Sequence, residues 1–218
     1  MVIARIKPMD EILGFISGKK SVLVAGCAGC TAVCLAGGQR EVDSLIRDLD
    51  DNKGVIFEGY TVERQCEMEF VAELDHLIDG FQAVLSMACG AGVQFVAERF
   101  PGIPVFPALD TVFVGSNREV GQYQENCRCC GECQLAYTGG ICPVALCAKG
   151  IYNGPCGGSR DGKCEVDEKT DCAWCQIYER LKGQGRLDQI MNIKKPMKWK
   201  NQTQGTLVQR GYEKFRQD

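Results

Sequence analysis

The residues best suited to chemistry in this sequence are its cysteines. There are 15 of them in 218 residues, beside a single histidine. Thiolates are preferred ligands of zinc and of iron–sulfur clusters, so a chain this rich in cysteine is either a metal binder or a scaffold of disulfides. The first dense group has the spacing C-x₂-C-x₃-C, formed by Cys27, Cys30 and Cys34 directly after the apolar run 22–25. This group predicts a thiolate site at the end of a strand.

The expected compartment favours metal binding. The N-terminus has no apolar stretch suited to a signal peptide, and no run of about 18 apolar residues predicts a membrane span. We therefore expect a cytoplasmic protein, in which thiols stay reduced and do not form a disulfide scaffold. The net charge of −3 gives no indication of nucleic-acid binding.

Strands and helices are predicted to alternate through residues 1–115. Strand segments are expected at 22–25, 55–62, 81–87, 105–106 and 111–114, and helices at 9–17, 42–49, 70–78 and 92–100. Such alternation favours an α/β fold built on a small, doubly wound, mostly parallel sheet. Before the second helix, Gly37 and Gly38 are expected to let the backbone approach another segment closely.

The predicted sheet would bring distant cysteines together. Cys27, Cys66 and Cys89 each follow a strand, and parallel strands end at one edge of a sheet, where open α/β folds bind ligands. Cys30 and Cys34 would reach the same edge from the loop and helical turn after the first strand. The sequence therefore predicts a metal site from these five residues, and leaves open which four would hold one cluster.

The amino-acid composition of the sequence changes near residue 116. Residues 116–180 contain ten cysteines and little apolar periodicity, so metal cross-links are expected to hold this cysteine-rich region together. Its cysteines are Cys127, Cys129, Cys130, Cys133, Cys142, Cys147, Cys156, Cys164, Cys172 and Cys175. Residues 181–218 form a third segment, a basic and aromatic arm. The arm is expected either to be solvated or to dock on a partner.

Part of the cysteine-rich region follows a ferredoxin pattern. Cys127, Cys130 and Cys133 have the spacing C-x₂-C-x₂-C that opens the bacterial ferredoxin run. The next cysteine, Cys142 before Pro143, comes after eight residues instead of three, and Cys129 is additional. Ten cysteines supply two [4Fe–4S] clusters with two thiols left over, or one cluster and a Cys₄ zinc site.

Four sequence blocks together resemble a known family. The blocks are CAGCTAVCLAGGQREV, ERQCE, SMACGAGVQ and NGPCGG-x₅-C. In combination they resemble the small iron–sulfur subunit of methylenetetrahydrofolate reductase from acetogenic and related anaerobic bacteria. The resemblance covers residues 22–175, and so nearly the whole chain outside the arm.

The resemblance implies a role in one-carbon metabolism of the Wood–Ljungdahl type. It implies that the chain passes electrons to FMN or FAD in a partner catalytic subunit, which reduces 5,10-methylenetetrahydrofolate to 5-methyltetrahydrofolate. A further subunit or a ferredoxin would supply the electrons. Two [4Fe–4S] clusters are expected, with a third cluster or one zinc ion as alternatives for the remaining cysteines. The resemblance also implies that the arm binds the catalytic subunit.

A different class of function is also open. The chain could be a structural scaffold without redox activity, whose Cys₄ zinc sites brace a partner subunit. No Ser/His/acid set or phosphate loop is present, so we expect no catalytic residue in the chain itself.

Overall fold

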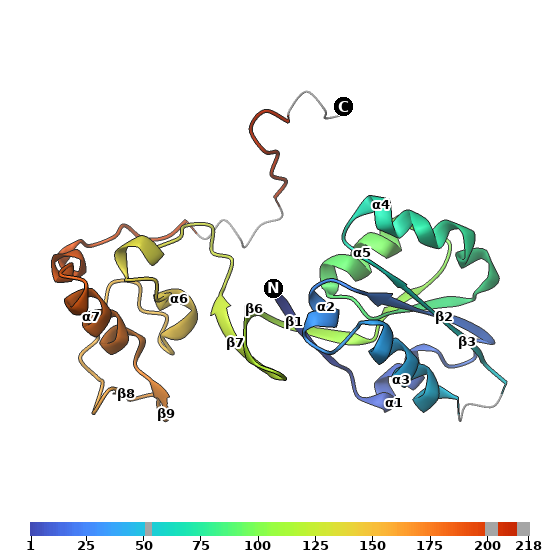
Figure 1. Cartoon of the computed structure of the whole chain (residues 1–218), viewed down its shortest axis with the longest axis horizontal. Helices are drawn as coiled ribbons and strands as arrows, with labels where there is room; N and C mark the ends of the chain where they lie inside the picture. Colours follow the sequence, from blue (N-terminus) through green and yellow to red (C-terminus); the bar gives the residue numbers. More distant parts are fainter. Residues whose placement is uncertain (51–53, 199–204, 213–218) are drawn as a thin grey trace. The chain divides into compact units, whose positions relative to one another are not determined.

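A four-stranded parallel sheet forms the centre of the first half of the chain. The computed structural model describes residues 1–50, 54–198 and 205–212 (Figure 1). The strands are β2 (Ser21–Cys27), β3 (Ile56–Val62), β4 (Ala83–Ser86) and β5 (Val105–Pro107), in the order β3-β2-β4-β5. All three neighbouring pairs are parallel, with Cys27 opposite Val62 at the end of β2 and β3. The predicted α/β class with a parallel sheet is confirmed.

Helices cover both faces of this sheet. On one face, Val22 and Val24 of β2 pack against α1 (Met9–Phe15) and α3 (Gln39–Leu49). On the other face, Leu23 and Ala25 pack against α4 (Met68–Val71), the 3₁₀ helices η1 (Ala72–His76) and η2 (Ile78–Gly80), and α5 (Gly90–Arg99). Consecutive residues of β2 are therefore buried on opposite faces, which explains its continuous apolar sequence. Placing the helices on both faces makes the sheet doubly wound.

A second, antiparallel sheet was not expected. It consists of β1 (Val2–Ile6), β6 (Leu109–Glu119) and β7 (Gln122–Cys127), in the order β1-β6-β7. The segment 111–114, expected to continue the last strand of the parallel sheet, belongs to β6 and pairs with β1. β1 was missed because a strand of five residues is recognisable mainly from its partner, which lies more than 100 positions away.

The first structural unit extends further along the chain than predicted. It comprises Met1–Glu125, and the second unit comprises Asn126–Asp218. The predicted boundary at residue 115 would fall inside β6, whose pairing with β1 and β7 keeps that strand in the first unit.

The second unit contains only short elements around a small core. They are η3 (Leu135–Tyr137), α6 (Pro143–Leu146), β8 (Lys163–Cys164), β9 (Asp167–Asp171), α7 (Ala173–Gly183) and η4 (Leu187–Met191). Ile141 packs with Trp174, Ile177 and Leu181 of α7 in that core. The irregular character expected for this region is observed.

The start of the arm also differs from the prediction. The segment expected from residue 181 begins inside α7, with Leu181 fully buried. Asn153 exchanges two hydrogen bonds with the backbone of Lys194, at 2.9 and 2.8 Å, and Met197 is buried. Residues up to 198 are therefore held by their own unit. Three residues of the predicted basic and aromatic arm, Trp199, Lys200 and Phe215, lie outside the described residues.

Candidate metal centre

Four cysteines lie near the carboxyl ends of the parallel strands. We call Cys27, Cys30, Cys66 and Cys89 the edge cysteines. Cys27 ends β2, and Cys30 begins the one-turn helix α2 (Cys30–Val33) that follows. Cys66 lies in the loop between β3 and α4, and Cys89 is the residue before α5. The sheet topology therefore brings three separate chain segments to one edge, as the sequence predicts.

The thiol of Cys66 lies in the electrostatic field of the other three edge cysteines. Burial raises the pKa of the Cys66 thiol, and negative charge on Cys89, Cys27 and Cys30 raises this pKa further. Such repulsion at Cys66 indicates that the other three thiols lie near it. A bound metal ion would reverse the effect, because its positive charge stabilises thiolates.

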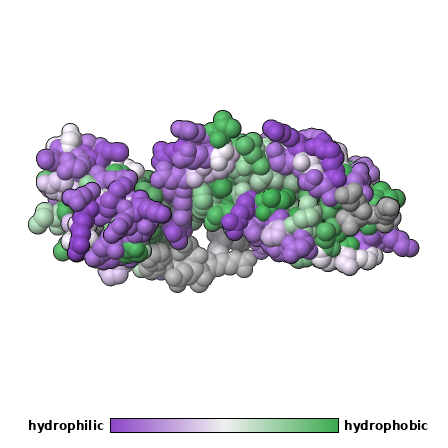
Figure 2. Space-filling model, turned by 90° about the horizontal axis from the view of Figure 1, so that it is seen from below, coloured by the Kyte–Doolittle hydropathy of each residue, from purple (hydrophilic) through white to green (hydrophobic). Residues whose placement is uncertain are grey.

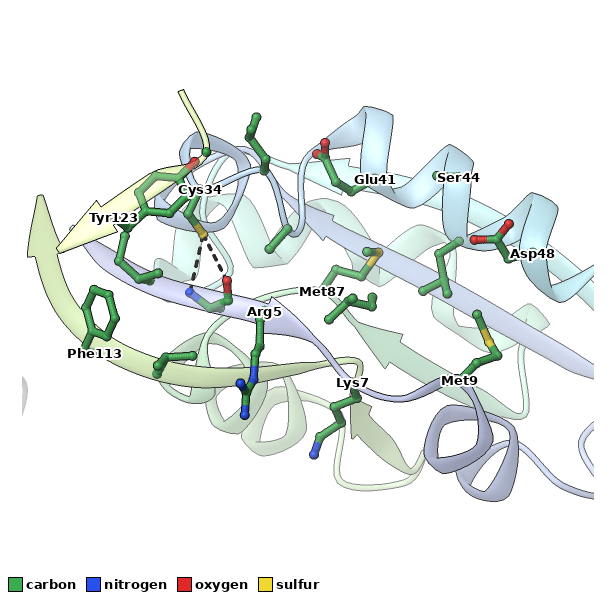
Figure 3. A pocket seen from close by; sticks show the side chains of 18 residues that line it. Arg5, Lys7, Met9, Cys34, Glu41, Ser44, Asp48, Met87, Phe113 and Tyr123 are labelled. Atoms are coloured by element: carbon green, nitrogen blue, oxygen red, sulfur yellow. Dashed lines mark hydrogen bonds between the residues drawn. The ribbon is translucent and has the colours of Figure 1, made fainter. Parts of the chain in front are cut away.

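The fifth N-terminal cysteine has different surroundings. Cys34 is 5% exposed and packs in the core between α3 and β1. Its sulfur accepts the Ala4 backbone N–H at 3.5 Å and lies 3.6 Å from the Ala4 carbonyl oxygen (Figure 3). It also lies 3.5 Å from the carbonyl oxygen of Thr31. Burial raises the pKa of this thiol most, and negative charge on Cys30 and Glu41 raises it further. Of the five candidates, Cys34 is the one whose sulfur already contacts backbone N–H and C=O groups.

A buried glutamine fixes the loop that carries Cys66. Gln65 is fully buried, and its side-chain amide donates to the carbonyl oxygens of Ala25 and Gly26 at 2.8 and 3.0 Å. Its carbonyl oxygen accepts the Ser86 hydroxyl at 2.6 Å. This one side chain joins the loop after β3 to the ends of β2 and β4. Sequence reasoning missed it, because only its position next to Cys66 distinguishes it from an exposed glutamine.

Close backbone contacts also shape this edge. A Cβ atom on Gly37 would lie 1.9 Å from the carbonyl oxygen of Met87, and the Gly37 carbonyl accepts the Cys27 N–H at 2.8 Å. A Cβ atom on Gly92 would lie 2.9 Å from Cβ of Gln65. The close approach predicted at Gly37 is confirmed, and its partner is the segment after β4.

In the second unit, three cysteines meet at the end of β7 and in the loop that follows it. We call Cys127, Cys129 and Cys130 the loop cysteines. The Cys129 backbone N–H donates to the Cys127 sulfur at 3.3 Å. The pKa of the Cys129 thiol is raised by burial and by negative charge on Cys127 and Cys130. Cys133 is exposed, and Cys142 is half-buried just before α6. No interaction among the described residues joins these two to the loop cysteines.

A second group in this unit surrounds a small cavity of about 10 Å³. We call its members the cavity cysteines: four line the cavity, and Cys175 lies beside them. The lining thiols are Cys147, Cys156, Cys164 and Cys172. The hydrogen bond with Ser159, at 3.2 Å, lowers the pKa of the Cys175 thiol, but burial and negative charge on Cys172 and Cys156 raise it more.

The described residues contain no ready-made site for a single ion. Over residues 1–50, 54–198 and 205–212, no three His, Cys, Asp or Glu side chains are arranged so that they could hold one metal ion. A single zinc needs its sulfur ligands about 2.3 Å from one point. In a cube, each cysteine binds a different iron atom, so that the thiols stand further apart. All fifteen cysteines are free thiols.

The fold and these thiols define an α/β protein with a cysteine-rich second unit. Its residues 106–200 match the protein family described as methylene-tetrahydrofolate reductase C terminal. This stretch contains all ten cysteines of the second unit and none of the edge cysteines, and it relates the chain to methylene-tetrahydrofolate reductase proteins. No curated protein and no solved structure matches the chain. Among the described residues, no helix has the length and apolar character needed to cross a membrane.

Proposed function

We propose that the chain is the iron–sulfur electron-transfer subunit of a methylenetetrahydrofolate reductase complex in the cytoplasm. The observation that carries this proposal is the convergence of the edge cysteines from three chain segments, in a chain whose second unit matches a reductase family. Four thiols of this kind match the ligand requirement of a [4Fe–4S] cluster.

The residues of the chain have separate tasks in this proposal. The edge cysteines would hold one cluster, and Gln65 would keep Cys66 in register with Cys27 and Cys89. Cys34 would stay a thiol. When bound, the clusters supply one-electron transfer between a donor and the flavin of the catalytic subunit.

The second unit would hold the remaining metal. The loop cysteines, with Cys133 and Cys142, supply enough thiols for a second cluster. Four of the five cavity cysteines line one small space beside the core residue Trp174, and Cys175 lies next to them. This compact arrangement favours either a third cluster or one structural zinc ion.

A scaffold function is the second candidate. It is favoured by the small core of the second unit, since structural zinc sites commonly stabilise segments that bury little apolar surface. In that case the chain would brace its partner and carry no electrons.

Anaerobic purification with metal analysis tests the proposal. We expect brown protein with about four iron atoms per cluster and an equal amount of sulfide. The chemically reduced protein should then reduce the flavin of the catalytic subunit in a rapid-mixing experiment. Colourless protein that contains only zinc would establish the scaffold. Iron without flavin reduction would reject the electron-transfer role.

A further inference from the structure

A groove of about 760 Å³ runs along the first unit between β1 and α3 (Figure 3). Its volume lies within the range of about 300 to 1,000 Å³ that is common for binding clefts. Apolar side chains line most of it, and Ile6, Leu35 and Val112 are 47%, 49% and 46% exposed there. The face shown in Figure 2 has hydrophobic areas exposed over the first unit. Contiguous exposed apolar surface of this kind commonly marks a binding site.

One wall of the groove is the free edge of a sheet. β1 is the outermost strand of the order β1-β6-β7. Met1 and Gly115 exchange two backbone hydrogen bonds, and Lys7 N–H donates to the Ala108 carbonyl at 2.9 Å. Hydrogen-bonded residues alternate along antiparallel strands, so the even-numbered residues of β1 direct their N–H and C=O groups away from β6.

Ala4 and Ile6 are the two even-numbered β1 residues that line the groove, and their backbone groups are not equally free to pair with another strand. The backbone of Ala4 contacts the Cys34 sulfur. By this alternation the backbone groups of Ile6 face the groove side of β1, and outside the β1–β6 ladder the described residues make no backbone hydrogen bond to them. Ile6 therefore offers one donor and one acceptor, spaced as a neighbouring strand requires.

The α3 wall of the groove carries negative charge, and the β1 wall carries the two cations. Glu41 and Asp48 of α3 face the groove, and Lys7 forms ion pairs with Glu11 and Asp110, both at 2.7 Å. Two carboxylates and two cations, Arg5 and Lys7, therefore line the groove, and the ion pairs of Lys7 with carboxylates outside the lining offset its charge, which leaves the α3 wall negative. A segment that binds here should therefore carry positive charge.

We propose that an extended segment of a partner polypeptide, with lysine or arginine among apolar residues, docks in this groove and pairs with the backbone of Ile6. Strand addition of this kind takes affinity from main-chain hydrogen bonds and selectivity from the adjoining side-chain pockets. The inference rests on the proposed function, which identifies the partner as the flavin-bearing catalytic subunit. Leu35 and Cys34 lie just after α2, so docking here would bring the partner close to the helix that carries Cys30.

Hydrogen exchange in the purified complex tests this inference. Compared with the free chain, the complex should show at least about tenfold slower exchange of the Ile6 amide, because that amide gains a hydrogen bond. A complex that passes electrons but leaves Ile6 unprotected would overturn the groove inference alone. If no complex forms with the flavin-bearing subunit, the proposed function fails as well.

Substitutions separate backbone pairing from side-chain contact. Ile6→Pro removes the amide that β6 does not use and should weaken the complex at least about tenfold, whereas Ile6→Ala, which keeps the amide, should weaken it less. Asp48→Lys should weaken binding of the catalytic subunit, and the loss of affinity should be larger at low salt than at high salt. Iron content and circular dichroism like those of the unsubstituted chain would show that each variant is folded. Equal effects of Ile6→Pro and Ile6→Ala would contradict strand addition and indicate a site that binds side chains or a small apolar molecule.

Discussion

Cys30 and Cys34 stand at the two ends of the same short helix, yet their sulfur atoms have different environments. Cys30 contributes to the negative potential at Cys66, together with Cys27 and Cys89. Cys34 is buried against the backbone of Ala4. At the scale of single residues, the burial and hydrogen bonding of each sulfur therefore separate candidate ligands from a structural thiol. Spacing in the sequence does not make this distinction.

Replacing Cys89 by serine should remove the metal bound by the first unit. The iron of the second unit should stay, because its cysteines belong to other chain segments. Cys34→Ser is the matched control, since a hydroxyl can use the same backbone partners at Ala4 and Thr31. Iron and sulfide analysis with electron paramagnetic resonance measures both effects. Iron loss in the control, or none with Cys89→Ser, would show that the ligands are assigned incorrectly.

Replacing Gln65 by alanine should destabilise the first unit by about 3 kcal/mol. The substitution leaves two carbonyl oxygens and the Ser86 hydroxyl without their partner at a fully buried position. Gln94→Ala is the control, because Gln94 bonds the Gly90 carbonyl at an exposed site, and it should change stability by less than about 0.5 kcal/mol. Urea unfolding measures the difference. Equal stability of the two variants would mean that Gln65 does not fix the loop.

At the scale of elements, the edge site depends on loops that approach one another at backbone distance. The segment after α2 contacts the segment after β4 through Gly37, and α5 approaches Gln65 through Gly92. Thr31 reinforces the first contact, since its backbone carbonyl accepts the N–H groups of Ala36 and Gly37. Side chains at these glycines would push the edge cysteines apart.

Gly37→Ala should therefore destabilise the first unit by at least about 2 kcal/mol, through overlap with the Met87 carbonyl. Gly14→Ala provides the opposite case, because Gly14 lies in α1 with no atom within 4 Å of an added Cβ. There alanine should stabilise by about 0.5–1 kcal/mol through its better helix propensity. Thermal unfolding of both variants compares them. If Gly37→Ala left the stability of the first unit unchanged, the two loops could move apart without a cost in free energy.

At the scale of the whole molecule, the two units differ in what holds them together. The first unit has two hydrophobic clusters, one on each face of its parallel sheet. The second unit has one small cluster and ten cysteines. Its stability should accordingly depend on bound metal, because metal binding contributes folding free energy where little apolar surface is buried.

Removing metal with a chelator under oxidising conditions should unfold the second unit first. Limited proteolysis should then cleave within residues 127–172, while the sheet of the first unit stays protected. Mass spectrometry of the fragments locates the cuts, and the metal-loaded protein is the control. Cleavage of the first unit at the same rate would indicate that the two units depend on metal equally.

The sequence by itself determined the parallel sheet, its covering helices and the edge to which the cysteines come. These features follow from local patterns: apolar runs ended by glycine, helical spacing such as Val42, Leu45 and Leu49, and cysteines placed directly after strands. Only the tertiary structure decided the pairing of β1 with β6, the burial of Cys34 against the backbone of Ala4, and the groove beside Ile6. Each of these depends on contacts between residues 30 or more positions apart, and such contacts are fixed by packing of the whole unit and leave no local pattern in the sequence.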